Sequence, residues 1–241
     1  MRSILGTLPE TVSPLLGKPM MILTRRLVCR VAAALSLAMT TGADVSAATV
    51  ELATNGGFET GDLTGWTSFE TGPGQQSAST DNPKTGTYSG LINNNAVGAS
   101  NSLWKQANLG IGTVVPNQLV TISFDARGSY AVPGGVSFAE FFSEVDGGGV
   151  SKAELLGGAP LAINGDPNVW TSFMYTATTG PDVSAGVTLQ LGAVNSPDAS
   201  GTTMFFDNVS VTIEAAAVPE PASATLLCLG AVGLVLRRRQ R

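Results

Sequence analysis

Hydrophobic and polar residues alternate along several short stretches in the middle of the chain. Such a period of two is typical of β-strands that bury one face. The stretches are separated by Gly, Pro, Asn and Asp, which favour turns, and no segment of ten or more residues keeps the apolar spacing of a helix. The seven candidate strands are residues 88–93, 102–107, 119–126, 136–141, 170–177, 187–191 and 205–213.

Seven or eight strands in this region predict an all-β fold, a two-sheet jelly-roll β-sandwich. We expect the sandwich to occupy residues 48–217, between an N-terminal extension with a signal peptide at 1–47 and a sorting signal at 218–241. Residues 146–149, Asp-Gly-Gly-Gly, are expected to form a flexible hairpin tip. No phosphate-binding glycine pattern follows a strand in the sequence.

The N-terminal segment has the parts of a secretory signal peptide. Three arginines precede the apolar or small residues 31–39, and a polar stretch with small residues at its end follows. We therefore expect a signal peptide helix and cleavage after Ala47 or Ala48. Residues 1–19 are interpreted as a long basic region or as the result of an unused start codon. Two adjacent arginines also occur in twin-arginine signals, which stay an open alternative.

The C-terminal segment has three parts in a fixed order. Val218-Pro219-Glu220-Pro221 is followed by the uncharged, apolar or small residues 222–236 and then by an arginine-rich end. Proline cannot continue a helix from upstream, and basic residues stay on the cytoplasmic side of a membrane. As a helix the apolar run would reach ~22 Å, short of a ~30 Å hydrocarbon core. Thinning of the bilayer and snorkelling of the arginine side chains must therefore cover the difference.

This tail resembles the PEP-CTERM sorting signal of exported Gram-negative proteins. The resemblance implies that an exosortase recognises the tail and cuts near the Pro-Glu-Pro, and that the C-terminal helix is held in the inner membrane until then. A plain membrane anchor is the alternative, but it would not require Pro-Glu-Pro next to the helix. The residues that carry the resemblance are Pro219, Glu220, Pro221, Arg237, Arg238 and Arg239.

Composition and charge narrow the range of functions. Only 13% of the 241 residues are charged, and residues 48–217 carry 4 Lys/Arg against 15 Asp/Glu, a net charge of −11. An acidic middle repels nucleic acid and anionic membrane surfaces. The chain has no His, which excludes catalytic triads with His, a His general base and His-ligated zinc. Cys29 and Cys228 lie in the end segments, so burial alone must hold the middle.

Two motifs mark the beginning and the end of the middle segment. Residues 55–66 begin Asn-Gly-Gly-Phe-Glu and end in Gly-Trp, and residues 205–211 read Phe-Phe-Asp-Asn-Val-Ser-Val. Together they resemble carbohydrate-binding modules of the galactose-binding-like jelly-roll type, in which such sequences belong to the first and the last strand. Residues 86–89 and 170–173 fit weaker interior motifs. The resemblance covers nearly all of residues 50–214.

The same resemblance implies a structural calcium site. In such modules the Glu of the first motif and the Asp of the last strand meet beside the ion, which corresponds to Glu59 and Asp207 here. Backbone carbonyls near Gly57 and in residues 84–86 would help to supply the six to eight oxygens that calcium needs. Alternatively, Glu59 caps a loop and Asp207 accepts backbone N–H bonds. A catalytic carboxylate pair is a third interpretation.

A sugar site needs an aromatic platform beside hydrogen-bonding groups. Trp104 is the main candidate because Lys105 and Gln106 follow it, and Tyr130 lies near a strand end. We therefore take Trp104, Gln106 and Tyr130 as weak ligand-binding candidates, with a half-buried strand aromatic as the alternative for Trp104. Trp66 and Trp170 are interpreted as packing residues.

The leading hypothesis is an exported, non-enzymatic protein that an exosortase sorts to the cell envelope or the extracellular matrix. Its partners would be signal peptidase and exosortase, with no nucleic acid. The second hypothesis is a polysaccharide-binding module that acts in that matrix, and the third is a glycoside hydrolase. Calcium is the one cofactor that we expect.

Overall fold

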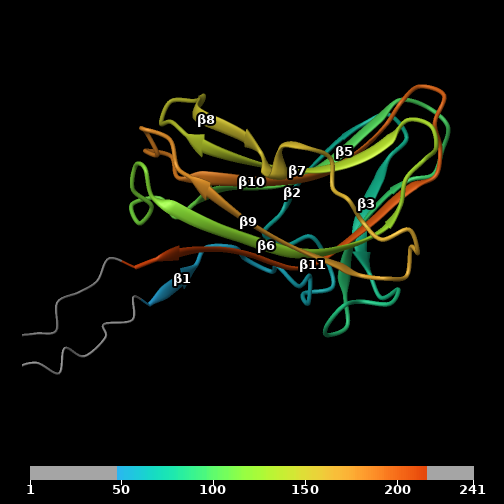
Figure 1. Ribbon diagram of the computed structural model, residues 1–241, viewed down its shortest axis with the longest axis horizontal. Coiled ribbons are helices and arrows are strands. Elements are labelled where there is room, and N and C mark those ends of the chain that lie inside the picture. The colour runs from blue at the N-terminus through green and yellow to red at the C-terminus, as the bar shows by residue number, and fades with distance from the viewer. Residues whose placement is uncertain (1–47, 216–241) are drawn as a thin grey trace, which may run out of the picture. The chain divides into compact units, whose positions relative to one another are not determined.

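The computed structural model describes residues 48–215 (Figure 1). The expected signal peptide, the sorting signal, their two helices and both cysteines lie outside these residues. Within residues 48–215, no helix is long and apolar enough to cross a membrane. The described part is all-β, as the alternation predicts, and its single helical element is the short 3-10 turn η1, Leu156–Gly158.

Eleven strands make up the described residues. They are β1 Thr49–Glu51, β2 Thr67–Thr71, β3 Gln75–Ser79, β4 Ser89–Asn94, β5 Ser100–Leu109, β6 Leu119–Ser129, β7 Gly135–Glu144, β8 Val150–Leu155, β9 Thr171–Thr178, β10 Val187–Asn195 and β11 Thr202–Glu214. Seven of them correspond to the predicted strands. The expected total of seven or eight was too low, because β1, β2, β3 and β8 are short and polar or exposed and show no alternation.

The strands form two antiparallel sheets that pack face to face (Figure 1). The β11 sheet has the order β3-β4-β11-β6-β9, with β1 also paired to β11, and the β10 sheet has the order β2-β5-β10-β7-β8. From β4 onward the pairs are nested: β4 with β11, β5 with β10, β6 with β9 and β7 with β8. This nested pairing is the jelly-roll arrangement that the sequence predicts.

The turn between β7 and β8 is the expected hairpin tip. Its backbone closes through a hydrogen bond from Val145 N to Gly149 O at 3.0 Å and another from Gly148 N to Val145 O at 3.1 Å. The three glycines all have positive φ angles, which residues with a side chain rarely adopt. The glycine run is therefore explained by the geometry of the tip.

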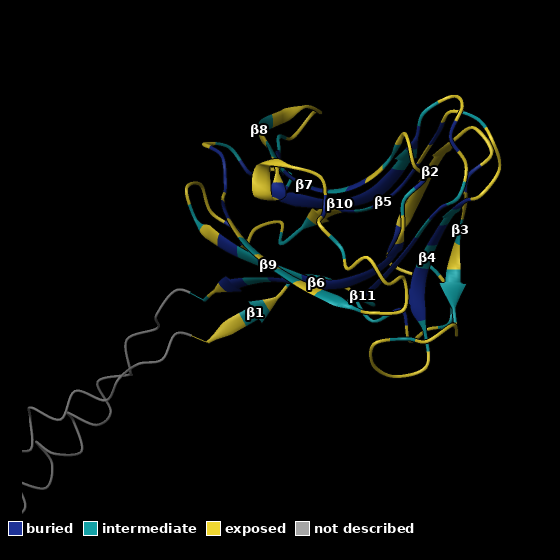
Figure 2. Ribbon diagram, turned by 45° about the vertical axis from the view of Figure 1, so that its right-hand side comes forward, coloured by how far each residue is buried: buried dark blue, intermediate teal, exposed yellow. Residues whose placement is uncertain are grey.

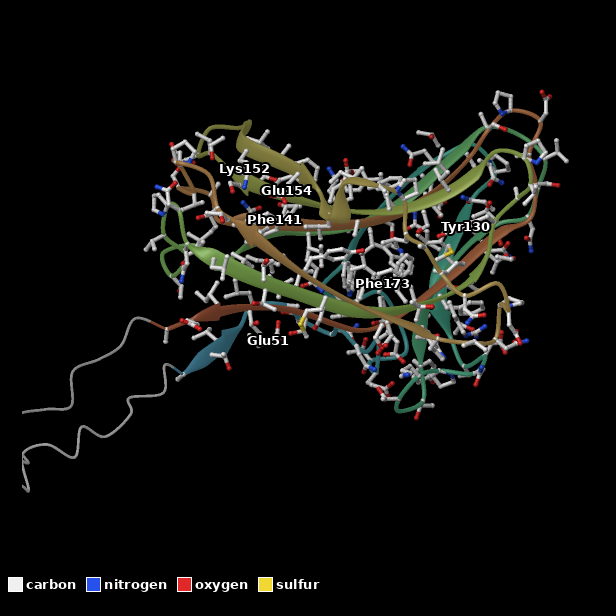
Figure 3. All side chains as sticks on the ribbon, in the orientation of Figure 1. Glu51, Tyr130, Phe141, Lys152, Glu154 and Phe173 are labelled. Atoms are coloured by element: carbon white, nitrogen blue, oxygen red, sulfur yellow. The ribbon has the colours of Figure 1, made fainter. Side chains whose placement is uncertain are left out.

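The core lies between the sheets, where the buried residues of both inner faces meet (Figure 2). At its centre the Trp104 ring of β5 contacts the rings of Phe58, Trp66 and Phe206, with ring centroids 5.3, 6.1 and 5.7 Å apart. Figure 3 shows Phe173 of β9 among the side chains between the sheets. Aromatic rings from both sheets therefore interlock, and each contact adds to the stabilisation from burial.

Gly90 of β4 provides a test of how tightly this centre is packed. A Cβ atom at Gly90 would lie 2.5 Å from Cζ of Phe58 and 2.6 Å from Cη2 of Trp104. We expect Gly90→Ala to lower the free energy of unfolding by ~1–3 kcal/mol, the usual cost of overpacking. Gly165→Ala, with no atom within 4 Å of its Cβ, should change it by less than ~0.5 kcal/mol. If urea unfolding shows the same loss of free energy of unfolding in Gly90→Ala and in Gly165→Ala, the centre around Trp104 is not tightly packed.

Candidate functional site

The first motif of the chain forms a loop and not a strand. Residues 52–66 connect β1 to β2, which corrects the expectation that Glu59 lies in the first strand. The loop turns sharply because Asn55 and Phe58 have positive φ angles of 50° and 58°. The Asn55 side chain holds the loop together by donating to Thr64 O, and Trp66 Nε1 donates to Asn55 O. The motif thus fixes the position of Phe58 in the core and of Glu59 beside it.

The structure brings the predicted carboxylate pair to one loop, the one that joins β3 to β4. Asp207 Oδ2 accepts hydrogen bonds from Lys84 N at 2.8 Å and from Thr85 N at 3.1 Å. Glu59 accepts from Thr87 N and Tyr88 N, all at 3.0 Å. The two acids therefore connect the start of the domain and its last strand to the same turn.

Asp207 is placed by an irregularity in β11. The register with β6 shifts between Asp207 and Ser210, and Asn208 has a positive φ of 51°. Asn208 N donates to Asp207 Oδ1 at 2.7 Å, and Asn208 Nδ2 donates to Asp125 Oδ2 at 2.9 Å. This bulge points the Asp207 carboxylate away from the ladder toward the loop.

The electrostatics of the pair leave negative charge without a cationic partner. Burial raises the pKa of Asp207, the three backbone N–H bonds oppose this rise, and the nearby charge of Glu59 adds to it. The Asp207 side chain is fully buried, and within residues 48–215 no Lys or Arg forms an ion pair with Asp207 or Glu59. The Asp207 carboxylate is therefore compensated by backbone N–H groups and not by a cationic side chain.

The pair offers carboxylate oxygens, the type of ligand that a hard cation such as calcium prefers. Gly86 leaves room beside Glu59, because a Cβ there would lie 2.4 Å from Glu59 Oε1, whereas a Cβ at Gly57 would make only an ordinary contact with Asp207 Oδ1 at 3.7 Å. Because the described residues hold no group of three or more His, Cys, Asp or Glu that could bind one metal ion, backbone carbonyls would have to complete the coordination shell.

The three weak ligand candidates do not form a sugar site. Trp104 is completely buried and has no ring face open to solvent, which corrects its assignment as a platform. Gln106 is also buried, and its amide holds Thr54 by accepting from Thr54 N and donating to Thr54 O. Tyr130 donates its hydroxyl hydrogen to Leu161 O, and burial raises its pKa to about 12. All three therefore act as structural residues.

The other two tryptophans pack, as expected from the sequence. Trp66 stacks on Phe58 with ring centroids 5.5 Å apart. The guanidinium carbon of Arg127 lies over the Trp170 ring, 5.2 Å from the ring centroid, and Trp170 Nε1 donates a hydrogen bond to Asn82 O at 3.1 Å.

A surface on the outer side of the β10 sheet is not among the sites that the sequence predicts, and we call it the aromatic face. It consists of Phe69, Leu103, Lys105, Phe138, Glu140, Phe142 and Gln190. Two rows of paired residues run across the strands of this sheet. The first row is Phe69, Leu103, Gly192 and Phe138, and the second is Lys105, Gln190 and Glu140. The sheet bends so that this side lies within the curve (Figure 2).

The aromatic face combines ring surfaces with polar groups. Phe69 is 47% exposed, and Lys105 Nζ lies 5.1 Å from its ring centroid and 5.8 Å from that of Phe142. The Phe138 ring covers Gly192, where a Cβ would lie 2.8 Å from Phe138 Cζ. The Lys105 ammonium group is thus close to two of the rings, those of Phe69 and Phe142.

Little in the sequence indicates this face. The one signal is that residues 135–144 carry phenylalanines on both sides of a strand, at Phe138 and Phe142 as well as at the buried Phe141. Phe69 lies in the polar stretch Thr-Ser-Phe-Glu-Thr, and only the strand register places it beside Lys105.

Comparison with known families identifies the C-terminal tail. The family model for the PEP-CTERM protein-sorting motif matches residues 217–239. The chain therefore carries a PEP-CTERM sorting motif, which implies a secreted protein that is processed by an exosortase. Among curated proteins, no sequence matches the chain.

Comparison with solved structures bears on the fold alone. The enzymatically active domain of tailspike protein 4 from bacteriophage CBA120 has a TM-score of 0.54 at 14% identity, and the match covers 67% of this chain. The chain spans only 21% of that tailspike chain. The CBM22-1 xylan-binding domain of Paenibacillus barcinonensis Xyn10C has a TM-score of 0.49 at 16% identity and covers 71% of this chain and 99% of that domain. TmCBM61, solved in complex with β-1,4-galactotriose, has a TM-score of 0.48 at 16% identity, and the match covers 68% of this chain and 99% of TmCBM61.

The raised pKa of Asp207 predicts a pH dependence in metal-free protein. Because its folded-state pKa lies above that of the unfolded chain, this group stabilises the fold most fully at pH below 3.8, and the contribution is lost as the pH rises through the folded-state pKa. In the presence of a chelator, the free energy of unfolding of the wild type should therefore rise relative to that of Asp207→Asn as the pH falls from 7 toward 4.

The substitution Asp182→Asn is the matched control. Hydrogen bonds from Ser184 lower the pKa of Asp182, so its contribution is lost as the pH falls through the folded-state pKa, the opposite trend. Urea unfolding at several pH values measures both. A pH-independent difference between wild type and Asp207→Asn would show that burial does not control this carboxyl.

Proposed function

We propose that the mature protein is a non-catalytic polysaccharide-binding protein of the cell envelope or extracellular matrix, and that the aromatic face is its binding surface. The observation that carries the proposal is the combination on this face of the exposed Phe69 ring with the partly exposed Phe138, Phe142 and Lys105. The C–H faces of sugars stack on rings, and their hydroxyls take directed hydrogen bonds from ammonium, amide and carboxylate groups.

The polar groups of the face are spaced for a chain-like ligand. Lys105, Gln190 and Glu140 lie on three neighbouring strands, and the Gln190 amide donates to Glu140. Neighbouring strands lie ~4.8 Å apart, so this row extends ~10 Å across the sheet, about two sugar rings. A polysaccharide crossing the strands would contact the rings in one row and the polar groups in the next.

The carboxylate pair supports a structural role better than hydrolysis. A glycosidase needs two carboxyl groups on either side of the scissile bond. Asp207 is fully buried, and both of its oxygens already accept backbone N–H bonds. We therefore propose that Glu59 and Asp207 hold a calcium ion with backbone carbonyls near Gly57 and in residues 84–86, and that the ion stabilises the loop.

Substitutions on the aromatic face test the binding function. We expect Phe69→Ala and Lys105→Ala each to weaken polysaccharide binding by about tenfold or more, equivalent to ~1.4 kcal/mol. Both side chains lie on the surface, so the melting temperature should change little. Met174→Ala, which removes a side chain that is 75% exposed on the outer side of the other sheet, is the control.

The measurement is binding of the mature secreted protein to a glycan array, followed by titration with the best ligand. Binding that survives Phe69→Ala and Lys105→Ala unchanged, or the absence of binding to any glycan, would contradict the proposal. Release of reducing ends from a bound polysaccharide would contradict its non-catalytic part.

Chelation tests the calcium site. An ion that binds only the folded protein raises the free energy of unfolding by ~2.7 kcal/mol at a hundredfold excess over Kd. We expect a chelator to lower the melting temperature of the wild type, and Asp207→Asn and Glu59→Gln to abolish the response. Glu70→Gln, on exposed β2, should keep it. A melting curve that is the same with calcium and with chelator would leave the two acids as hydrogen-bonding residues only.

A further inference from the structure

The two ends of the described chain lie side by side at one end of the sandwich. Ala215 N donates a hydrogen bond to Ala48 O at 2.7 Å, and β1 pairs with the last residues of β11, Thr49 opposite Glu214. Figure 1 shows β1 beside the end of β11. Cleavage after Ala47 or Ala48, as expected from the sequence, would leave the new N-terminus at this point.

The short strand β1 is firmly attached. Glu51 Oε1 accepts hydrogen bonds from Val211 N and Ala53 N, both at 2.8 Å, and Leu52 N donates to Val211 O at 2.8 Å. Folded structure therefore continues to within a few residues of the sorting motif, which begins at residue 217.

This spacing limits how far the cleavage site lies from the sandwich. Pro219 is four residues beyond Ala215. A fully extended chain spans at most ~3.6 Å per residue, so the Pro-Glu-Pro begins no more than ~14 Å from folded structure. A peptidase that holds this segment in its active site must therefore lie against the end of the sandwich.

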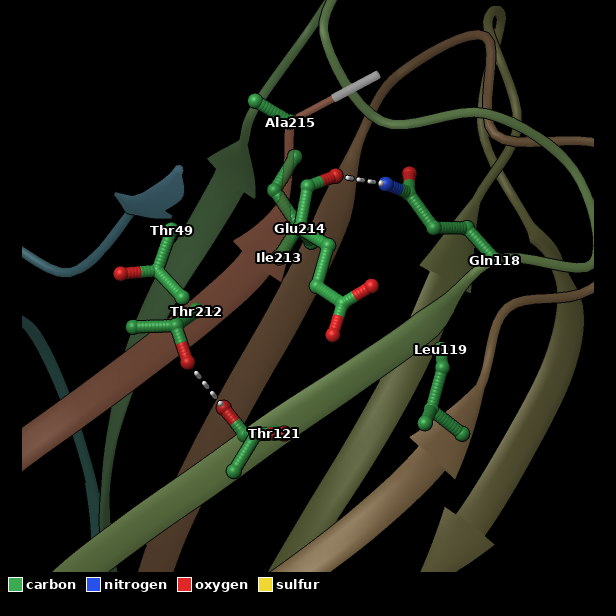
Figure 4. Close-up of a pocket in the computed structure, with 8 residues that line it drawn as sticks. All are labelled: Thr49, Gln118, Leu119, Thr121, Thr212, Ile213, Glu214 and Ala215. Atoms are coloured by element: carbon green, nitrogen blue, oxygen red, sulfur yellow. Dashed lines mark hydrogen bonds between the residues drawn. The ribbon is translucent and has the colours of Figure 1, made fainter. Parts of the chain in front are cut away.

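The end of the sandwich where the chain leaves β11 contains a pocket. A pocket of about 350 Å³ lies beside the point where the chain leaves β11 (Figure 4), and we call its lining the terminal face. Gln118 Nε2 donates to Glu214 O at 3.2 Å across it, and Leu119 exposes 58% of its surface on its rim. The lining residues are Thr49, Gln118, Leu119, Thr121, Thr212, Ile213, Glu214 and Ala215.

The chemistry of the terminal face favours a protein partner over a lipid surface. Its lining contains hydroxyl, amide and apolar groups and one carboxylate, and no Lys or Arg. With a net charge of −11 on residues 48–217, the domain is repelled by anionic headgroups. A protein surface can instead fill the pocket and pair with its backbone and hydroxyl groups.

We propose that the terminal face is a docking surface for the sorting peptidase, so that the enzyme recognises the folded end of the sandwich as well as the motif. This inference rests on the PEP-CTERM assignment and is independent of polysaccharide binding. Recognition of both elements restricts processing to chains whose last strand is already in place.

Pulse-chase processing of the full-length precursor, in cells that contain the exosortase, tests the proposal. Leu119→Asp and Thr49→Asp should slow processing several-fold without changing the melting temperature. Val97→Asp is the matched control, because Val97 is 71% exposed in the loop that joins β4 to β5, far from the terminal face along the strands. Replacing Pro219, Glu220 and Pro221 by Ala gives the unprocessed baseline.

An eight-residue Gly/Ser spacer between Ala215 and Ala216 separates docking from simple crowding. If the terminal face contributes to recognition, the spacer should slow processing, and Leu119→Asp should have no further effect in its presence. Faster processing with the spacer, or wild-type rates in Leu119→Asp and Thr49→Asp, would overturn the proposal. Glycan binding measured on the same variants shows separately whether the proposed binding function holds.

Discussion

The packing of Trp104 is the interaction on which the rest of the structure depends. Its indole ring, from the β10 sheet, contacts Phe206 of the β11 sheet and Phe58 and Trp66 of the first loop. Parts of the chain about 150 residues apart therefore share one buried contact. Because the next residue after Phe58 is Glu59 and the next after Phe206 is Asp207, the same packing fixes both acids at the β3–β4 loop.

Each strand that contributes to this core also presents an outer face, and the two faces have separate roles. In β5, Trp104 points inward while Lys105 points to the aromatic face. In β7, Phe141 is buried while Phe138 and Phe142 line the surface. Packing and proposed binding are thus properties of alternate residues on the same rigid strands, which position binding groups better than loops do.

The sequence is sufficient to predict the central strands, the hairpin tip and the sorting motif, because alternation, glycine runs and the Pro-Glu-Pro are local signals. The sequence is not sufficient to predict the edge strands of the two sheets or the residues of the aromatic face. Strands such as β2 show no periodicity, and Trp104 looked like a surface residue because its neighbours Lys105 and Gln106 are polar. Gln106 is polar yet buried, where it satisfies Thr54. Which residues share a face is decided by register between distant strands, and no local pattern records it.

The position of β11 has a consequence for the time at which folding can finish. This last strand lies between β4 and β6 and also pairs with β1, the first strand. Contacts of such long sequence separation form slowly, since loop closure must precede them. If the chain crosses the membrane unfolded from its N-terminus, as the expected secretory signal peptide implies, it cannot complete the β11 sheet until residue 214 has emerged. Translocation would then delay the final folding step until the sorting motif reaches the membrane.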